Sequence, residues 1–355
     1  MNHHQEILNL ITSPAFAVLD GAIAQCNDEA QRLHFSIGDK IGPMLPADCK
    51  EYPGFQGECL FLSLTHNEIR YSCTVMQIDG TDVFILDPDE DQKELKTLSL
   101  TAANMRQPLS AMIATAGNLF PLIEQAQDPK VKEQVDHMNR SLCQMHRMLC
   151  NMSDALQYAD GSSRHMVCQN IVEVVTGIFQ RAQELSQHNG IELKYSVPNE
   201  PILCSVDEQL LERGIYNILS NALKFSEPGT VIQASLTRRD GTLYISVQDQ
   251  GSGIPGQIMR TVFQRYMRQP SLEDSRFGLG LGLVLVRAAA RIHGGTVLID
   301  RPASVGTRTT ISIPIRQSPQ SMVRSNFALV DYAGGWDHGL LELSDVLPAH
   351  LYNTK

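Results

Sequence analysis

The sequence of 355 residues contains no long apolar run and no charged-then-apolar segment at its start. A helix that crosses a membrane needs about 20 consecutive apolar residues, and a secretory signal peptide begins with a charged region followed by an apolar one. We therefore expect a protein with no membrane span and a cytoplasmic location.

The sequence also lacks the cysteine and histidine spacings of metal sites. Its eight cysteines include no Cys-x-x-Cys pair, and its eleven histidines include no His-Glu-x-x-His pattern. Those spacings mark zinc sites and redox motifs, and disulfides are rare in chains that are not exported. We expect reduced cysteines and no metal site built from protein side chains alone.

Positive charge is in short supply, with 29 Lys and Arg against 39 Asp and Glu, for a net charge of -10. Such a balance argues against non-specific binding to nucleic acid or to an anionic membrane. The hydrophobic fraction of 43% is ordinary for a globular chain, so a full core is available. The length predicts two or three domains.

A strand followed by a glycine-rich turn is the first motif that carries chemistry. Leu243, Ile245 and Val247 alternate with polar residues and predict a strand, so that Asp249 lies at its end. Gly251 and Gly253 follow at once, and glycine allows the backbone to approach a ligand closely.

A second glycine-rich stretch, Phe277–Leu283, leads directly into an apolar helix. Its glycines are Gly278, Gly280 and Gly282. The first turn of a helix has unpaired N–H groups and the positive end of the helix dipole, which together attract phosphate. We expect this stretch to bind an anion.

The third motif is a predicted helix, Glu208–Phe225, with amide and ammonium groups along one face. Asn217 and Asn221 are four residues apart and Lys224 follows three residues later, so all three lie on the same side. Asparagine oxygens are hard ligands that suit Mg²⁺ bound to a nucleotide. Lysine supplies a point charge for phosphate.

In this order and spacing, the three motifs resemble the ATP-binding domain shared by sensor histidine kinases, Hsp90, gyrase and MutL, and above all the histidine kinase version. The resemblance covers roughly residues 166–315 and implies a GHKL-type α/β sandwich over residues 162–316. It implies ATP and Mg²⁺ as cofactors, with the metal held by Asn217 and Asn221. Asp249 would accept a hydrogen bond from the adenine amino group, and Val262–Tyr266 would be the family's F box.

The same resemblance places an ATP lid at Gln264–Arg276, a polar stretch that contains a proline. Arg265, Arg268 and Arg276 are the lid residues that could reach the phosphates. The alternative for each is a solvated surface charge, and we expect one of the three to contact the nucleotide.

Residues 1–90 predict a small α/β domain of two strands, short helices and a three-stranded meander. The expected strands are Ala15–Leu19, Ala22–Gln25, Glu58–Thr65, Ile69–Gln77 and Asp82–Leu86. This order resembles a PAS-type sensory domain. Such a domain would either bind a small ligand or be packed solid and serve dimerisation.

Residues 91–160 predict a helical hairpin, because apolar residues recur with a helical period on both sides of Asp128-Pro129. Each apolar stripe needs a partner, and two such hairpins would form a four-helix bundle. The hairpin resembles the dimerisation domain of histidine kinases and implies a homodimer or a heterodimer with a competent kinase. The fold class expected overall is therefore α+β and multidomain.

One departure from the family lies in the first hairpin helix. The family sequence His-Glu-x-Arg-Thr-Pro-Leu, whose histidine accepts the phosphoryl group, is replaced by residues 103–109 with Ala103 and Asn104 in its first two positions. Alanine has no nucleophile, and an amide takes no proton at neutral pH. We therefore expect no autophosphorylation at the usual site, although the family implies a phosphotransferase.

Three residues keep alternatives open. His137 and His146 on the second hairpin helix are either substitute phosphoryl acceptors or seam-edge residues. Gln107 stands where the family has a residue that orients water for dephosphorylation, so it either serves a phosphatase or is a surface residue of good helix propensity.

Residues 317–355 form an appendage in which Phe327–Val330 could be a strand and Gly334-Gly335 a turn. It would either add strands to the nucleotide domain or cover its surface. The function expected is that of a histidine-kinase-like protein of two-component phosphorelay signalling, whose partner would be a response regulator receiver domain. The alternatives are a non-catalytic ATP-binding scaffold, a phosphatase of that regulator, and a serine kinase of the anti-sigma type, which the hairpin argues against.

Overall fold

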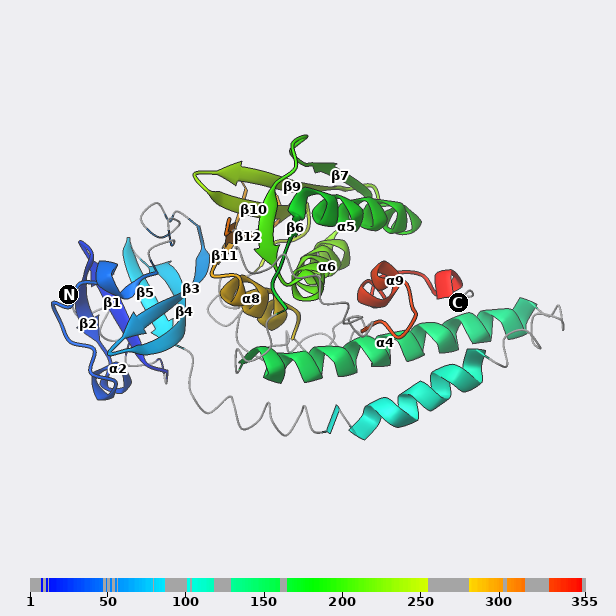
Figure 1. The fold of residues 1–355 in the computed structure, drawn as a ribbon, viewed down its shortest axis with the longest axis horizontal. Helices are drawn as coiled ribbons and strands as arrows, with labels where there is room; N and C mark the ends of the chain where they lie inside the picture. The colour runs from blue at the N-terminus through cyan, green and yellow to red at the C-terminus, as the bar shows by residue number, and fades with distance from the viewer. Residues whose placement is uncertain are drawn as a thin grey trace.

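The fold is α+β, with a long helix α4 (Pro129–Ala159) lying along one side of a large sheet and its covering helices (Figure 1). The computed structural model describes residues 8, 11, 13–46, 49, 52, 55, 57–78, 80–86, 101–102, 104–117, 129–159, 165–254, 281–302, 305–316 and 332–352, without the side chains of 154–159. Within these described stretches, no helix is both long and apolar enough to cross a membrane.

The N-terminal domain is an antiparallel sheet in the order β2-β1-β5-β4-β3. Its elements are β1 (Ala15–Leu19), β2 (Ala22–Cys26), α2 (Asp28–Arg32), η1 (Gly42–Met44), β3 (Cys59–His66), β4 (Ile69–Ile78) and β5 (Thr81–Leu86). The five predicted strands are confirmed to within a residue or so. Asn27 caps α2 by accepting a hydrogen bond from the amide of Ala30.

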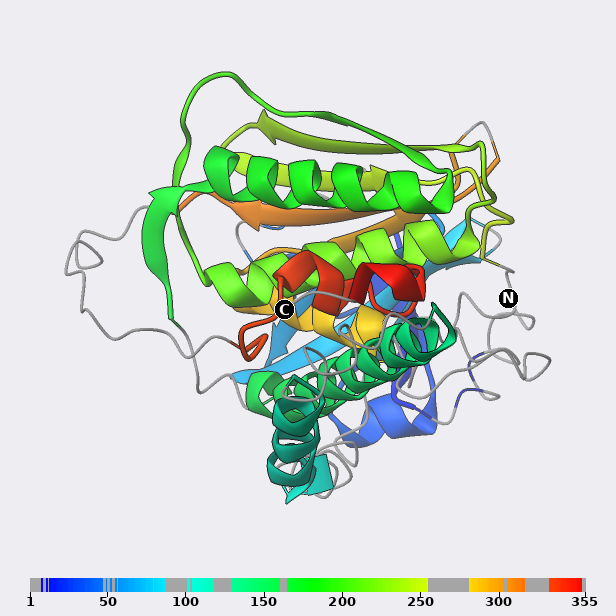
Figure 2. The same cartoon turned by 90° about the vertical axis from the view of Figure 1, so that its right-hand side faces the viewer.

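The second half of the chain forms an α/β sandwich, in which helices cover one face of a mixed sheet (Figure 2). The elements are β6 (Val167–Asn170), α5 (Ile171–Ser186), η3 (Gln187–Asn189), β7 (Glu192–Ser196), β8 (Leu203–Val206), α6 (Glu208–Phe225), β9 (Val231–Arg239), β10 (Thr242–Gln248), α8 (Gly282–Ile292), β11 (Val297–Asp300) and β12 (Arg308–Pro314). Only the β7–β9 pair is parallel, among the pairs described. The predicted helix Glu208–Phe225 is reproduced residue for residue by α6.

The two sheets are joined into one of ten strands, a feature that the sequence analysis did not anticipate. Strand β3 pairs antiparallel with β11, so that Phe61 lies opposite Val297 and Cys59 opposite Ile299. The guanidinium of Arg287 on α8 lies 4.9 Å from the centre of the Phe61 ring. The N-terminal domain is therefore attached to the helix that follows the second glycine-rich motif.

Burial on both faces of β3 explains this junction. Leu60 and Leu62 pack into the core of the N-terminal domain, whereas Cys59 and Phe61 pack into the core of the α/β sandwich. A strand that is buried on both faces has a continuous apolar sequence rather than an alternating one. Residues 59–64, Cys-Leu-Phe-Leu-Ser-Leu, fit that pattern.

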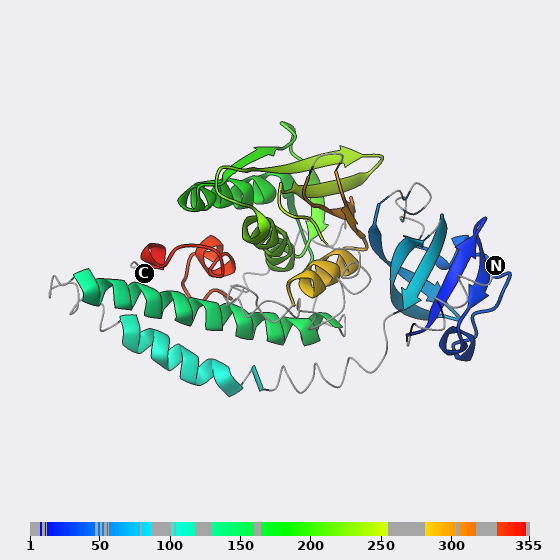
Figure 3. The same cartoon turned by 180° about the vertical axis from the view of Figure 1, so that it is seen from behind.

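Residues 104–117 are helical and run beside α4, as predicted for the hairpin (Figure 3). The contact is apolar and consists of one face of each helix: Ala102, Leu109, Ile113 and Ala116 against Leu142 and Leu149. The predicted apolar stripes are only half buried, because methionines beside this contact remain exposed.

The C-terminal segment, residues 332–352, is helical where it is described and lies between α4 and the helices α5 and α6 (Figure 2). It contains α9 (His338–Glu342) and η5 (Ala349–Tyr352), and Gly334 and Gly335 form the predicted turn with positive φ angles of 60° and 87°. Of the two roles left open for the appendage, these residues take the second and cover the surface of the nucleotide domain. The predicted strand Phe327–Val330 lies outside the described residues.

Candidate nucleotide-binding site

Helix α6 carries the first part of the site and is well specified by its sequence. Asp207 caps it by accepting a hydrogen bond from the amide of Leu210, and its apolar face packs into the core. Asn217 is buried, and its Nδ2 donates to the carbonyl oxygen of Arg213 at 2.8 Å. Asn221 and Lys224 are half-buried on the same side of the helix, as the spacing predicts.

The first glycine-rich motif meets the end of α6. A Cβ atom at Gly251 would lie 2.3 Å from the carbonyl oxygen of Phe225, a distance that no side chain tolerates. Gly253 has a φ angle of 74°, which favours glycine. Gly251 is therefore required by the close approach of the turn after β10 to the C-terminal end of α6, and Gly253 by its backbone conformation.

The start of α8 meets the middle of α6. A Cβ atom at Gly282 would lie 3.0 Å from Oδ1 of Asn217, so the first residue of α8 is in contact with the face of α6 that carries Asn217 and Asn221. The described residues of both glycine-rich motifs thus lie against α6, which carries the third motif. Gly278 and Gly280, and the lid residues Arg265, Arg268 and Arg276, lie outside the described residues, as do Val262–Tyr266.

Asp249 is held in a fixed orientation at the end of β10. Its Oδ1 accepts hydrogen bonds from the amides of Gly251 at 2.8 Å and Thr307 at 3.0 Å. Burial raises the pKa of its carboxyl above the ordinary value, and the two amides offset part of that rise. Both bonds end on the same oxygen, so Oδ2 can accept a donor such as an exocyclic amine.

The loop before β12 completes this corner of the site, and the sequence analysis did not identify it. A Cβ atom at Gly306 would lie 2.0 Å from the carbonyl oxygen of Asp249, and the φ angle of Gly306 is 115°. A glycine at this position is therefore needed for Thr307 to reach the carboxylate. The only signal in the sequence was a glycine just before the last strand, which is too common to be diagnostic.

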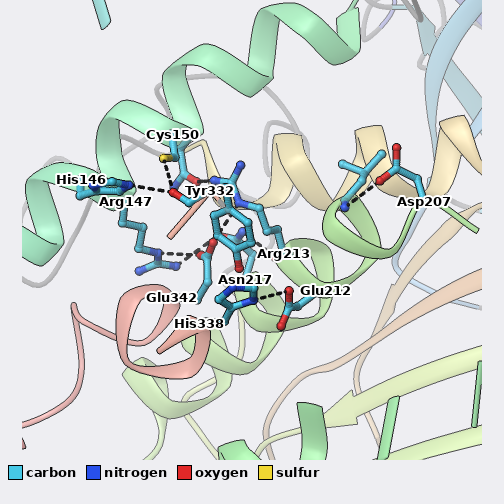
Figure 4. A network of polar contacts seen from close by, with 12 residues as sticks. His146, Arg147, Cys150, Asp207, Glu212, Arg213, Asn217, Tyr332, His338 and Glu342 are labelled. Carbon is cyan, nitrogen blue, oxygen red and sulfur yellow. Dashed lines mark hydrogen bonds and ion pairs between the residues drawn. The ribbon is translucent and has the colours of Figure 1, made fainter. Parts of the chain in front are cut away.

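A network of polar side chains lies beside Asn217 (Figure 4), and no sequence pattern indicated it. It joins α4, α6 and the C-terminal segment through Arg147, Arg213 and Glu342. Arg147 also donates through Nη2 to Oδ1 of Asn217 at 3.3 Å. Burial alone would lower the pKa of Arg213, but Glu342 and its neighbours raise it above the ordinary value, so this guanidinium is charged.

The residues of this corner fit a nucleotide with its metal. Asp249 can accept from a base, Asn217 and Asn221 present amide oxygens that suit Mg²⁺, and Lys224 adds positive charge for phosphate. In the parts of the chain that the structure describes, no group of three or more His, Cys, Asp or Glu could hold a metal by itself.

Of the hairpin residues singled out, Asn104 and Gln107 lie exposed on helix 104–117, and Ala103 lies outside the described residues. His137 is exposed on α4. His146 is half-buried, and its Nε2 lies 2.8 Å from the carbonyl oxygen of Tyr332. The described part of the C-terminal segment thus contacts His146.

Comparison with known proteins agrees with this geometry. Residues 206–317 match the family model described as "Histidine kinase-, DNA gyrase B-, and HSP90-like ATPase". The chain is 27% identical to the sensor protein KdpD of Clostridium acetobutylicum over 213 residues, which are 59% of this chain and 23% of that protein. It is 31% identical to the histidine protein kinase DivJ of Caulobacter vibrioides over 147 residues, or 41% of this chain and 25% of that protein.

Among solved structures, full-length ShkA in complex with AMPPNP is similar in fold, with a TM-score of 0.51 and 21% identity. The match covers 64% of this chain and 46% of that one. This chain therefore spans less than half the length of each of these three relatives.

Proposed function

We propose that this chain, which is similar to sensor histidine kinases through its GHKL-type ATP-binding domain, binds ATP with Mg²⁺ and acts in two-component phosphorelay signalling. We further propose that it does not phosphorylate itself at the usual position. Its partner would be the receiver domain of a response regulator.

The observation that carries the nucleotide part is that described residues of both glycine-rich motifs lie against α6, the helix of the third motif. Gly251 approaches the end of that helix, Gly282 approaches Asn217, and Asp249 is oriented with one oxygen open to a donor. Phosphoryl transfer depends mainly on positioning and on charge neutralisation. The groups that would supply both are present on these elements.

The acceptor, by contrast, is missing from the sequence. Ala103 offers no nucleophile, and the neighbouring Asn104 cannot act as a general base. Two separate requirements for autophosphorylation are thus absent. A protein of this kind would either phosphorylate a partner that has its own histidine or change conformation on binding ATP without consuming it.

The test is incubation of the purified protein with Mg²⁺ and γ-labelled ATP, compared with the double variant Ala103→His/Asn104→Glu. We expect no label on the wild type and acid-labile label on the variant, because only the acceptor and its base are missing. Acid-labile label on the wild type would contradict the proposal. Mapping would then begin at His137, since His146 is engaged by the carbonyl of Tyr332.

We also propose a dimer, supported by exposed methionines on both hairpin helices. Met105 is 52% exposed and Met138 39% exposed, although both lie on predicted apolar stripes. A second hairpin would bury them in a four-helix bundle. We expect Met138→Glu to shift the protein from dimer to monomer in light scattering, whereas Asn104→Ser on the exposed side should not.

Dephosphorylation of a receiver domain is a second candidate, favoured by the exposed amide of Gln107 on helix 104–117. An amide can hold a water in line for attack on a phosphoryl group. Loss of receiver phosphate should be faster with the protein than without it, and Gln107→Ala should remove the difference. Equal rates with wild type and Gln107→Ala would exclude this role.

A further inference from the structure

A buried carboxylate joins the C-terminal segment to two other elements. Glu342 on α9 is fully buried, with Oε1 2.9 Å from Nε of Arg213 on α6 and Oε2 3.2 Å from Nε of Arg147 on α4. Arg147 also contacts Asp345 at 2.7 Å. Charges buried this deeply are stable only while all members of the network are present, so the three elements are held together as one unit.

Further contacts fix the same segment along α4. Arg140 donates to the carbonyl oxygens of Ser344 and Asp345, and Gln144 donates to that of Ser344. Asn139 donates to the carbonyl oxygen of Tyr352. Because side chains of α4 bind the carbonyl oxygens of Ser344, Asp345 and Tyr352, the segment is docked in one register.

The network also reaches the nucleotide site. Nη2 of Arg147 donates to Oδ1 of Asn217, and Nδ2 of Asn217 is bonded to the carbonyl of Arg213. The oxygen that would face Mg²⁺ is therefore already paired with a cation. A divalent metal at this position would meet the positive charge of Arg147, which disfavours binding.

We propose that residues 332–352 are a latch that holds the ATP-binding domain against α4, and that the Mg²⁺–nucleotide complex and the latch compete for Asn217. The proposal rests on the proposed binding of ATP. Binding of the metal–nucleotide complex withdraws Asn217 from Arg147 and loosens the Arg147–Glu342–Arg213 network, which releases α4 from the domain. Loosening of the latch strengthens binding by the same factor, because coupling between two sites is reciprocal.

The chain contains its own probe of this equilibrium. Trp336 is the only tryptophan, and it is buried in the latch, with its ring 6.4 Å from that of Tyr352. Its fluorescence emission shifts to longer wavelength when the indole is exposed to water. Emission from the full-length protein therefore reports on the latch without any label.

The experiment is titration of the full-length protein with AMPPNP, with and without Mg²⁺, followed by Trp336 emission and in parallel by calorimetry. Arg147→Met removes the contact with Asn217 and leaves Glu342 paired with Arg213. Arg140→Met is the matched control, because Arg140 binds the latch without touching Asn217. Each variant's emission before titration reports whether it is folded around the latch.

We expect Mg²⁺–AMPPNP to shift the wild-type emission to longer wavelength. Arg147→Met should bind the complex about 5- to 150-fold more tightly than the wild type. The increase in affinity should be smaller for metal-free AMPPNP than for the complex, and smaller for Arg140→Met than for Arg147→Met. Binding by the variant but not by the wild type would support the latch most strongly. Calorimetric binding with unchanged emission and equal affinity for wild type and Arg147→Met would overturn it. If neither binds nucleotide, the proposed function fails and the latch proposal fails with it.

Discussion

Replacing Asp249 by asparagine should separate nucleotide binding from stability. The amide oxygen of the new side chain can accept the same two hydrogen bonds from Gly251 and Thr307. Its NH₂ group then occupies the place of Oδ2 and meets the amino group of the base, donor against donor. The substitution therefore leaves the fold intact and removes one contact with the nucleotide.

The expected magnitudes follow from these contacts. A hydrogen bond to a charged group contributes about 1.5–3 kcal/mol, so binding of Mg²⁺–ATP should weaken by about 10- to 150-fold. Asp249→Ala should weaken it similarly, but it also leaves two buried amides without an acceptor, at about 1–3 kcal/mol each. Calorimetry gives the affinity, and thermal unfolding gives the stability.

The direction of the pH dependence also follows. Because burial raises the pKa of Asp249 in the folded state, its carboxyl contributes stability below the unfolded pKa, and this stability is lost as pH rises through the folded pKa. At neutral pH the buried carboxylate thus costs stability, and Asp249→Asn should unfold at the same temperature as the wild type or higher. Nucleotide affinity should fall with acidification in a window above the ordinary aspartate range. A variant that binds normally, or that is destabilised as much as Asp249→Ala, would refute the reasoning.

Two further substitutions test the packing around the site. Glu342→Ala leaves two buried arginines without their carboxylate and should lower the free energy of unfolding, measured by tryptophan fluorescence in urea, by about 3–5 kcal/mol. The control Glu184→Ala, at an exposed ion pair, should lower it by no more than about 1 kcal/mol. Similar losses for the two variants would count against the network. Gly251→Ala forces its Cβ against the carbonyl of Phe225 and should cost about 1–3 kcal/mol together with nucleotide affinity. Gly177→Ala points into open space on a helix and should be neutral or stabilising, so equal melting temperatures for the two alanine variants would disprove the contact.

The sequence pattern predicted many helices, strands and turns, because capping, apolar periodicity and turn preferences depend on residues that are close in sequence. Helix α6 has a capping aspartate, a helical apolar period and Pro228-Gly229 shortly after its end, and its bounds were predicted to the residue. The turn at Gly334-Gly335 was predicted for the same reason. The convergence of Asp249, Asn217 and Gly282 came from the family resemblance, since no periodicity brings residues so distant in sequence together.

The docking of the C-terminal segment could not be predicted, because its determinants are single residues on three elements. Arg147, Arg213 and Glu342 each look like ordinary solvated charges on amphipathic helices, and only their shared burial distinguishes them. The appendage was expected either to add strands to the nucleotide domain or to cover its surface, and its residues 332–352 cover that surface, with α9 packed against α4, α5 and α6. What decides between the two is the partner surface, which the local sequence does not contain.

The junction between the two sheets, in contrast, is indicated by a sequence pattern, the apolar run at residues 59–64. The strand at the edge of a three-stranded meander should alternate if one of its faces meets solvent, yet residues 59–64 are buried without interruption. That pattern requires a second covering layer, and Phe61 finds it against Arg287 and the sandwich core. Because α8 begins at Gly282 beside Asn217 and its Arg287 lies over the ring of Phe61, one helix contacts both the junction strand β3 and the nucleotide site.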